Sequence, residues 1–265
     1  MRIIYWYNYL CYTCFKDQGD DIVRKYNYGS IILILIVSSI IVGFVQNIFD
    51  GNLSVLGGIV SFIADYIICR GLLYNREGSF SEYFRGIKTM TGKVFLMNFL
   101  VAAITVALLT LAMLLSGAGF LLTNDYEVSN SRVLTSLVIL FSLVTVFLSL
   151  IFAYLNLFMA DERYRDLPFF DSLKLIIKAG TKLFQETFKT ALDVFKISLI
   201  CGVVALISLI FILQGMEALT VFAIIFGVVS AIGFFLCQPT YRARISDIYV
   251  EKSEEIYREV IEEEK

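Results

Sequence analysis

The sequence of 265 residues contains no histidine and only two prolines. Without histidine the chain lacks the commonest general base and the commonest metal ligand, and every Ser-His-Asp or Cys-His arrangement is excluded. The sequence also contains no phosphate-binding loop, metal motif or nucleophile signature. The net charge of −2 argues against nucleic-acid binding. We therefore predict a protein that is not an enzyme and that uses no metal and no other cofactor.

Charge is also scarce. Charged residues make up 17% of the chain and hydrophobic residues 58%, whereas a soluble domain has about 25% and just under 50%. The apolar residues gather into runs near or above the roughly 20 residues that span a hydrocarbon core. These runs predict an all-α, polytopic membrane bundle of about six transmembrane helices, at residues 29–49, 53–74, 94–122, 133–159, 194–213 and 218–237. Pro239 should end the last helix, because it has no amide hydrogen.

Three parts of the chain follow from these runs. Residues 1–28 are aromatic and mixed in charge, which predicts an interfacial amphipathic segment. Residues 29–240 form the six-helix transmembrane domain, and residues 241–265 form a cytoplasmic C-terminal helix with an acidic tail. Cys11 and Cys14 could bind a metal or form a redox pair, but no second pair and no histidine completes four ligands. Two ordinary interfacial cysteines are the preferred interpretation.

The basic residues predict the orientation. Arg132 is the only lysine or arginine in the three loops 50–52, 123–132 and 214–217, although the chain has 22 such residues. Short loops rich in lysine and arginine stay in the cytoplasm. Both termini should therefore be cytoplasmic.

The segment 169–189 has the pattern of an amphipathic helix. Large apolar residues recur every three or four positions from Phe169 to Phe188. Most of the other face is basic, with Lys174, Lys178, Lys182 and Lys189. We expect a helix in the membrane surface, with its lysines toward lipid headgroups, before the chain enters the fifth transmembrane run.

Asp65 is the least expected residue within a transmembrane run. It lies twelve residues after Leu53, or roughly 18 Å into a helix, where an unpaired charge costs several kcal/mol. Arg70, Lys93, Asn98 and Asn156 could complete a polar cluster with it. The candidates for a substrate or ion path are therefore Asp65, Arg70, Asn98 and Asn156. The alternative is a structural cluster, with Arg70 extending to the inner surface.

Two sequence segments carry a resemblance to a known family. PFFDSLKLIIKAGTKLFQETFKTAL and CQPTYRARISDIYVE resemble uncharacterised bacterial six-helix integral membrane proteins, a domain of unknown function. The proteins of this family are in turn similar in pattern to the membrane domain of some glycerophosphodiester phosphodiesterases. The shared Pro-x-Tyr and following aromatic would be Pro239, Tyr241 and Tyr249, whereas the family's frequent proline at the end of the third helix is missing. The resemblance implies a bacterial plasma-membrane protein. It carries over no catalytic residue, because the phosphodiesterase domain is absent.

Two functions fit these patterns. The first is a non-enzymatic accessory, scaffold or transport-related component, and the alternative is a permease subunit working with a cytoplasmic ATPase. An intramembrane enzyme is disfavoured by the absence of histidine. Besides the lipid bilayer, a cytoplasmic protein partner could dock on residues 75–92, on residues 161–193 or on the C-terminal tail.

Overall fold

The structure is a computed structural model that describes residues 24–48, 54–115, 131–213 and 216–262. The predicted interfacial segment, with Cys11 and Cys14, lies almost wholly outside these residues. Within them all regular structure is helical, which confirms the all-α prediction.

Six helices are long and apolar enough to cross a membrane, which confirms the number of transmembrane helices expected from the sequence. They form three hairpins of consecutive helices. The hairpins are α2 (Tyr28–Ile48) with α3 (Ser54–Tyr74), α5 (Gly92–Leu115) with α6 (Ser131–Ile151), and α9 (Phe184–Leu213) with α10 (Thr220–Tyr257).

Shorter helices connect the hairpins or extend them. The short α-helices are α4 (Phe80–Arg85), α7 (Leu155–Ala160) and α8 (Phe169–Lys182). The 3-10 turns are η1 (Gly86–Thr89), η3 (Glu162–Tyr164) and η4 (Glu217–Leu219), and α10 continues into the π-helical turn η5 (Arg258–Glu262).

Three helix boundaries differ from the sequence prediction. The fourth apolar run is not one helix: α6 ends at Ile151, and α7 follows as a separate, fully buried helix. The amphipathic stretch is divided at Leu183, so that Lys189 belongs to α9. Pro239 lies inside α10 and does not end it. Proline also disturbs the helical carbonyls that precede it, and the Tyr28 hydroxyl donates a hydrogen bond of 2.7 Å to one of them, Leu236 O.

The break between α6 and α7 coincides with a close approach of α8. The amide of Leu155 bonds to Phe152 O, one residue short of the α-helical pattern. Gly180 of α8 packs on the Ile151 carbonyl so closely that a Cβ at position 180 would lie 1.9 Å from that oxygen. Only glycine permits this contact.

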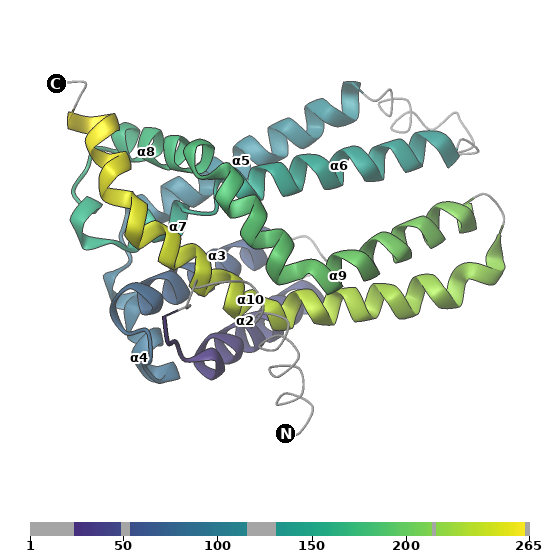
Figure 1. Cartoon of the computed structure of the whole chain (residues 1–265), viewed down its shortest axis with the longest axis horizontal. Coiled ribbons are helices and arrows are strands. Elements are labelled where there is room, and N and C mark those ends of the chain that lie inside the picture. The colour runs from purple at the N-terminus through teal and green to yellow at the C-terminus, as the bar shows by residue number, and fades with distance from the viewer. Residues whose placement is uncertain (1–23, 49–53, 116–130, 214–215, 263–265) are drawn as a thin grey trace.

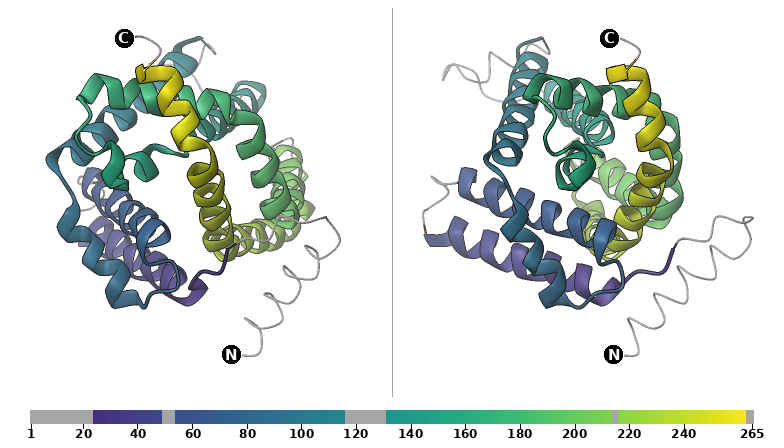
Figure 2. Two further views of the ribbon diagram at one scale, coloured as in Figure 1. Left: turned by 60° about the vertical axis from the view of Figure 1, so that its left-hand side comes forward. Right: turned by 90° about the vertical axis from the view of Figure 1, so that its left-hand side faces the viewer.

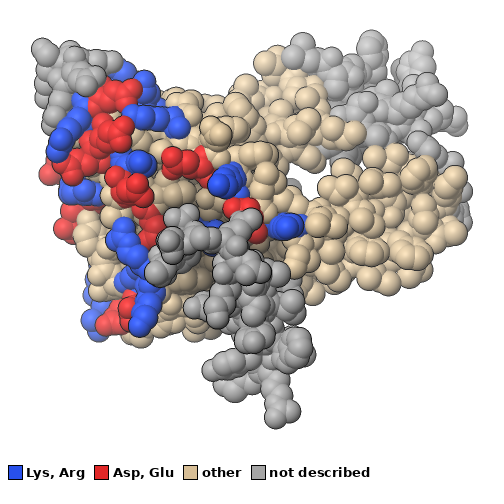
Figure 3. Space-filling view, viewed as in Figure 1, with Lys and Arg blue, Asp and Glu red and all other residues tan. Residues whose placement is uncertain are grey.

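The hairpins converge at one end and diverge from it. In Figure 1 the α5–α6 and α9–α10 hairpins extend to the right, whereas α2–α3 recedes from the viewer and crosses the right panel of Figure 2. Charged side chains gather where the hairpins converge, and the extended part is free of charge on the face seen in Figure 3. The largest cluster of buried residues combines α7 with residues of α3, α5, α8 and α10, so the main core also lies at the junction of the hairpins.

Candidate functional site

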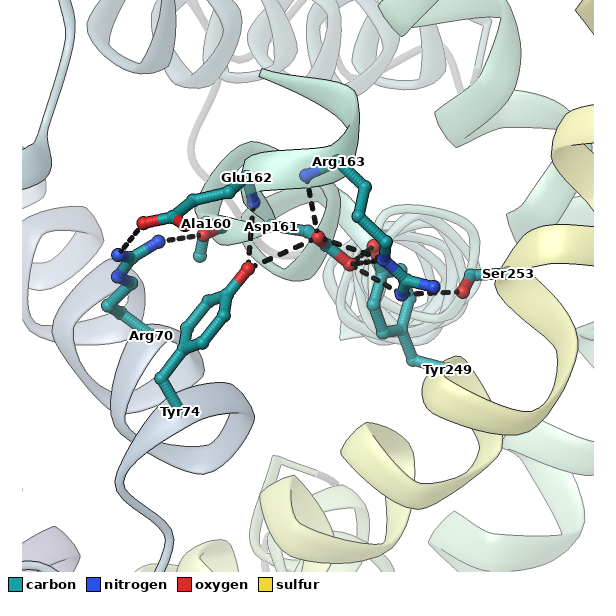
Figure 4. Close-up of polar contacts among 8 residues, drawn as sticks. All are labelled: Arg70, Tyr74, Ala160, Asp161, Glu162, Arg163, Tyr249 and Ser253. Carbon is teal, nitrogen blue, oxygen red and sulfur yellow. Dashed lines mark hydrogen bonds and ion pairs between the residues drawn. The ribbon is translucent and has the colours of Figure 1, made fainter.

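The site begins with the segment from Ala160 to Arg163, which passes between α3 and α10 (Figure 4). Arg70 of α3 donates a hydrogen bond of 2.7 Å to Ala160 O and forms an ion pair with Glu162. The Tyr74 hydroxyl accepts a hydrogen bond of 2.9 Å from the Glu162 amide, and the Arg70 guanidinium lies 4.1 Å from the centre of the Tyr74 ring. One helical turn of α3 thus binds both the backbone and a side chain of this segment.

Asp161 is the centre of the site, and it is 2% exposed. Its Oδ2 accepts hydrogen bonds from the Tyr249 hydroxyl of α10 at 2.9 Å and from Arg163 at 2.7 Å. Its Oδ1 accepts from the Arg163 amide at 3.0 Å and from the Tyr74 hydroxyl at 3.3 Å. Arg163 also reaches Ser253 of α10 at 3.3 Å. We call Asp161, Arg163, Tyr74, Tyr249 and Ser253 the Asp161 junction.

The electrostatics of the Asp161 junction favour a charged carboxylate. Burial alone would raise the pKa of Asp161, but hydrogen bonds from Arg163 and Tyr249, together with the guanidinium charge, hold this pKa below its ordinary value. The Asp161 carboxylate in turn raises the pKa of Arg163. Asp161 is therefore an ionised anchor at neutral pH, and its hydrogen-bonding positions are occupied by residues of the same chain.

Asp65, the main candidate from the sequence, pairs with a residue that the sequence analysis did not consider. Arg242 of α10 donates a hydrogen bond of 2.7 Å to Asp65 Oδ1 across a separation of 177 residues. The side chain of Asp65 is 30% exposed and that of Arg242 is 23% exposed. Arg70, which sequence proximity suggested as a partner, is engaged with Ala160 and Glu162 instead.

The remaining candidates for a substrate or ion path form a second contact. Asn98 of α5 donates a hydrogen bond of 3.0 Å to the side-chain oxygen of Asn156 in α7. Lys93, at the start of α5, donates to Leu167 O at 2.7 Å. Asn98 and Asn156 therefore bind each other, whereas Asp65 pairs with Arg242 and Arg70 with Ala160 and Glu162.

Of the four lysines assigned to a membrane-surface helix, two face the C-terminal segment. Lys178 lies 3.1 Å from Glu259, and Lys182 lies 3.0 Å from Glu255 and 2.7 Å from Glu259. The apolar face of α8 packs into the main core through Leu175 and Ile176. Lys174 lies on α8, whereas Lys189 lies on α9. On α8, apolar residues thus pack into the main core, and two lysines bind glutamates of α10 and η5.

A further ionic contact, between Asp247 and two arginines, was not expected from the sequence. Asp247 of α10 lies 2.9 Å from Arg76 and 3.2 Å from Arg24, and Arg76 also donates to Ala243 O at 3.2 Å. This contact joins the segments before α2 and after α3 to α10. The signal in the sequence for the ionic contacts of Arg242, Asp247, Glu255 and Glu259 is the polar stretch after Cys237, because polar groups that continue a transmembrane helix need partners.

These observations define the class of the protein. Six apolar helices with one charged end make it a multi-pass, all-α membrane protein. In the described parts of the chain no group of three histidine, cysteine or acidic residues is placed to hold a metal ion. Neither protein-family models nor curated proteins nor solved structures gave a match to the chain.

Proposed function

We propose that the protein is a non-enzymatic scaffold or accessory component of a bacterial plasma membrane. The observation that carries this proposal is the Asp161 junction, where ionised and hydroxyl groups bind one another and join α3 and α10 to the segment after α7. In such a network the polar groups bind one another and thereby hold the helices together. This arrangement supports a role in presenting a rigid surface over a role in chemistry.

Residues 75–92 supply one surface for a partner. The Tyr83 side chain of α4 is buried against Gly71 of α3, and its hydroxyl donates a hydrogen bond of 2.9 Å to Arg76 O. Burial raises the pKa of Tyr83 to about 12, so this hydroxyl stays protonated. With Tyr83 anchored, Phe84 and Arg85 remain exposed. Because aromatic residues and arginine are enriched at protein interfaces, this pair on a fixed turn is suited to docking a cytoplasmic protein.

A photo-crosslinking experiment tests the scaffold proposal. A photoreactive amino acid at position 84 should give one discrete crosslinked product in native membranes, and the same residue at position 99, on the lipid-facing side of α5, should not. The Tyr83→Ala variant should lose the product, and because it also removes a fully buried side chain from a core cluster, its folded fraction is measured in parallel. Equal products at positions 84 and 99 would argue against a docking surface.

We also propose that both termini are cytoplasmic. The distribution of basic residues supports this orientation. In a cysteine-free variant, a single cysteine at position 125 should react with a membrane-impermeant maleimide from outside, and one at the exposed position 254 should react only after permeabilisation. Labelling of position 254 in intact cells would reverse the orientation.

A permease subunit is the second candidate, and the Asp65–Arg242 pair favours it. This pair joins two membrane-spanning helices but is only partly shielded, as expected of groups beside a polar path. A stoichiometric ATPase among the crosslinked products at position 84 would support this function. Loss of transport in an Asp65→Asn variant that remains fully folded would support it as well.

A further inference from the structure

The exposed side of α8 carries large apolar side chains outside the six membrane spans. Phe170 is 78% exposed, more than any other large apolar side chain in the described part of the chain, and Ile177 is 41% exposed. Both lie between the fourth and the fifth span. They do not belong to the apolar face of α8 that packs into the main core. We therefore expect something outside the chain to cover them.

Two contacts place α8 at one membrane surface. Before its N-terminus, Leu167 O accepts a hydrogen bond of 2.7 Å from Lys93, in the first turn of α5. Near its C-terminus, Gly180 packs on the carbonyl of Ile151, the last residue of α6. Because α5 and α6 are consecutive spans, the start of α5 and the end of α6 lie at the same surface of the bilayer. Figure 1 shows α8 beside these two helix ends, so α8 lies along this surface.

The exposed side of α8 changes from apolar to basic around the helix. At about 100° per residue, Phe170 and Ile177 lie within about 20° of each other. The side of Gly180, which faces α6, adjoins them in one direction. Lys178 and Lys182 lie in the other direction, where they bind glutamates of α10 and η5. The apolar edge thus adjoins a membrane span, and the basic edge adjoins the polar C-terminal segment.

The apolar edge also leads into the exposed surface of the spans. Two turns after Ile177, the centre of the Phe184 ring lies 5.6 Å from that of Phe147 in α6 and 6.2 Å from that of Phe188. Phe147 is 52% exposed and Phe188 is 42% exposed, and both lie on membrane spans. A helix that is apolar toward the bilayer and basic away from it is typical of a membrane surface. Docking of a cytoplasmic protein would not require this order.

We propose that Phe170 and Ile177 insert among the phospholipids at this membrane surface, so that the bilayer itself covers the exposed side of α8. The contact is apolar and requires no particular headgroup charge, because Lys178 and Lys182 already bind glutamates. It therefore differs from the contact expected from the sequence, in which the lysines face the headgroups. It uses neither the Asp161 junction nor α4, so it does not depend on the scaffold function.

Tryptophan quenching in vesicles tests this proposal. The chain has a single tryptophan, Trp6, so the full-length Trp6→Phe protein can carry one tryptophan at a chosen position. In phosphatidylcholine vesicles, lipids brominated in the upper part of the acyl chain should quench both Phe170→Trp and Ile177→Trp. Bromines near the chain end should quench both less, because an interfacial helix reaches only the boundary between headgroups and acyl chains. Both native side chains are exposed, so a tryptophan should not disturb folding.

Two further single-tryptophan proteins serve as controls. Phe99→Trp, on the exposed side of α5, should be quenched strongly, and Phe170→Trp should approach it. Lys182→Trp, on the basic edge of α8, should be quenched by neither brominated lipid. Quenching of Phe170→Trp and Ile177→Trp no stronger than that of Lys182→Trp would overturn the proposal and leave this side to a protein partner or a second copy. Equal quenching at all three positions of α8 would also overturn it, because no one edge would then face the lipid.

Discussion

Phe158 of α7 is 1% exposed, whereas Phe99 of α5 is 67% exposed. Phe158 packs edge-on against Tyr249, with ring centroids 4.8 Å apart, in the cluster where the hairpins converge. Phe99 lies on a span of which only 11% is buried within the protein. The comparison shows two kinds of apolar residue in one chain. Those at the junction are enclosed by protein, and those on the hairpins are left to the bilayer.

This difference indicates where the stability of the fold originates. Lipid chains are as apolar as the side chains of the hairpins, so apolar surface alone gives little drive for the hairpins to associate in the membrane. Where the hairpins converge, buried aromatic side chains pack together and the ionised Asp161 carboxylate accepts hydrogen bonds from Arg163 and Tyr249. We therefore expect substitutions at the junction to affect stability far more than substitutions of comparable size on the hairpins.

Truncation of the two phenylalanines gives the largest expected difference between the regions. Phe158→Ala should lower the free energy of unfolding by about 3–5 kcal/mol, because it leaves a cavity in a packed core. Phe99→Ala should leave it nearly unchanged, because lipid fills the space. Thermal unfolding of both variants in the same detergent measures the difference. Equal losses would show that the hairpins are packed as tightly as the junction.

The contact between α8 and α6 is tested by two glycine substitutions. Gly180→Ala places a Cβ against the Ile151 carbonyl, and because backbone cannot rotate away, we expect a loss of about 3 kcal/mol. Gly43→Ala in α2 serves as the control, since no atom lies within 4 Å of a Cβ there. Alanine should stabilise that helix slightly. Unfolding midpoints of the two variants provide the measurement, and a tolerated Gly180→Ala would contradict the close approach.

Substitutions of Asp161 and Asp65 compare a buried carboxylate with a partly exposed one. Asp161→Asn leaves Arg163 without its counter-ion and should cost about 2 kcal/mol, a value reduced because Arg163 is half exposed. Asp65→Asn should cost about 1 kcal/mol or less, because the Asp65 side chain is 30% exposed whereas that of Asp161 is 3% exposed. Chemical denaturation of the two variants ranks them. A larger loss for Asp65→Asn would make its pair with Arg242 the main connection between α3 and α10.

Low pH should reproduce the loss of stability that we expect of the Asp161→Asn variant. The folded-state pKa of Asp161 lies below the unfolded value of about 3.9. Its stabilisation is therefore complete above about pH 4 and is lost as the pH falls through the folded-state pKa. Unfolding midpoints from pH 7 to pH 3 should decrease less at the acidic end in Asp161→Asn than in the wild type. Parallel curves would show that Asp161 does not contribute to the acid response.

The smallest effect is expected at Lys182. Its glutamate partners raise the pKa of this lysine, so the charge persists throughout the neutral range. The pairs are exposed to solvent, and salt screens them. Lys182→Gln should lower the unfolding midpoint slightly in low salt and not at all in high salt. Lys88→Gln, which removes an exposed charge from η1, should have no effect at either concentration, and a salt-independent loss at Lys182 would assign its role to packing.

Much of the fold follows from local features of the sequence. The lengths of the apolar runs identify six helices, and the short polar segments between them predict three hairpins. The periodicity from Phe169 onward predicts an amphipathic helix, although not which surface it covers. Composition and periodicity are counted along the chain, so these predictions need no information about distant residues.

The partners of the polar residues depend on the tertiary structure. Asp65 pairs with Arg242 at a separation of 177 residues, and that choice requires the directions of α3 and α10 in space. Pro239 remains inside α10, and the fourth run breaks at Ile151, where the backbone of α8 approaches. In each case a contact between distant segments outweighs a local preference. The reason is physical: partners stabilise a buried charge or an open carbonyl only where the fold brings them within about 3 Å.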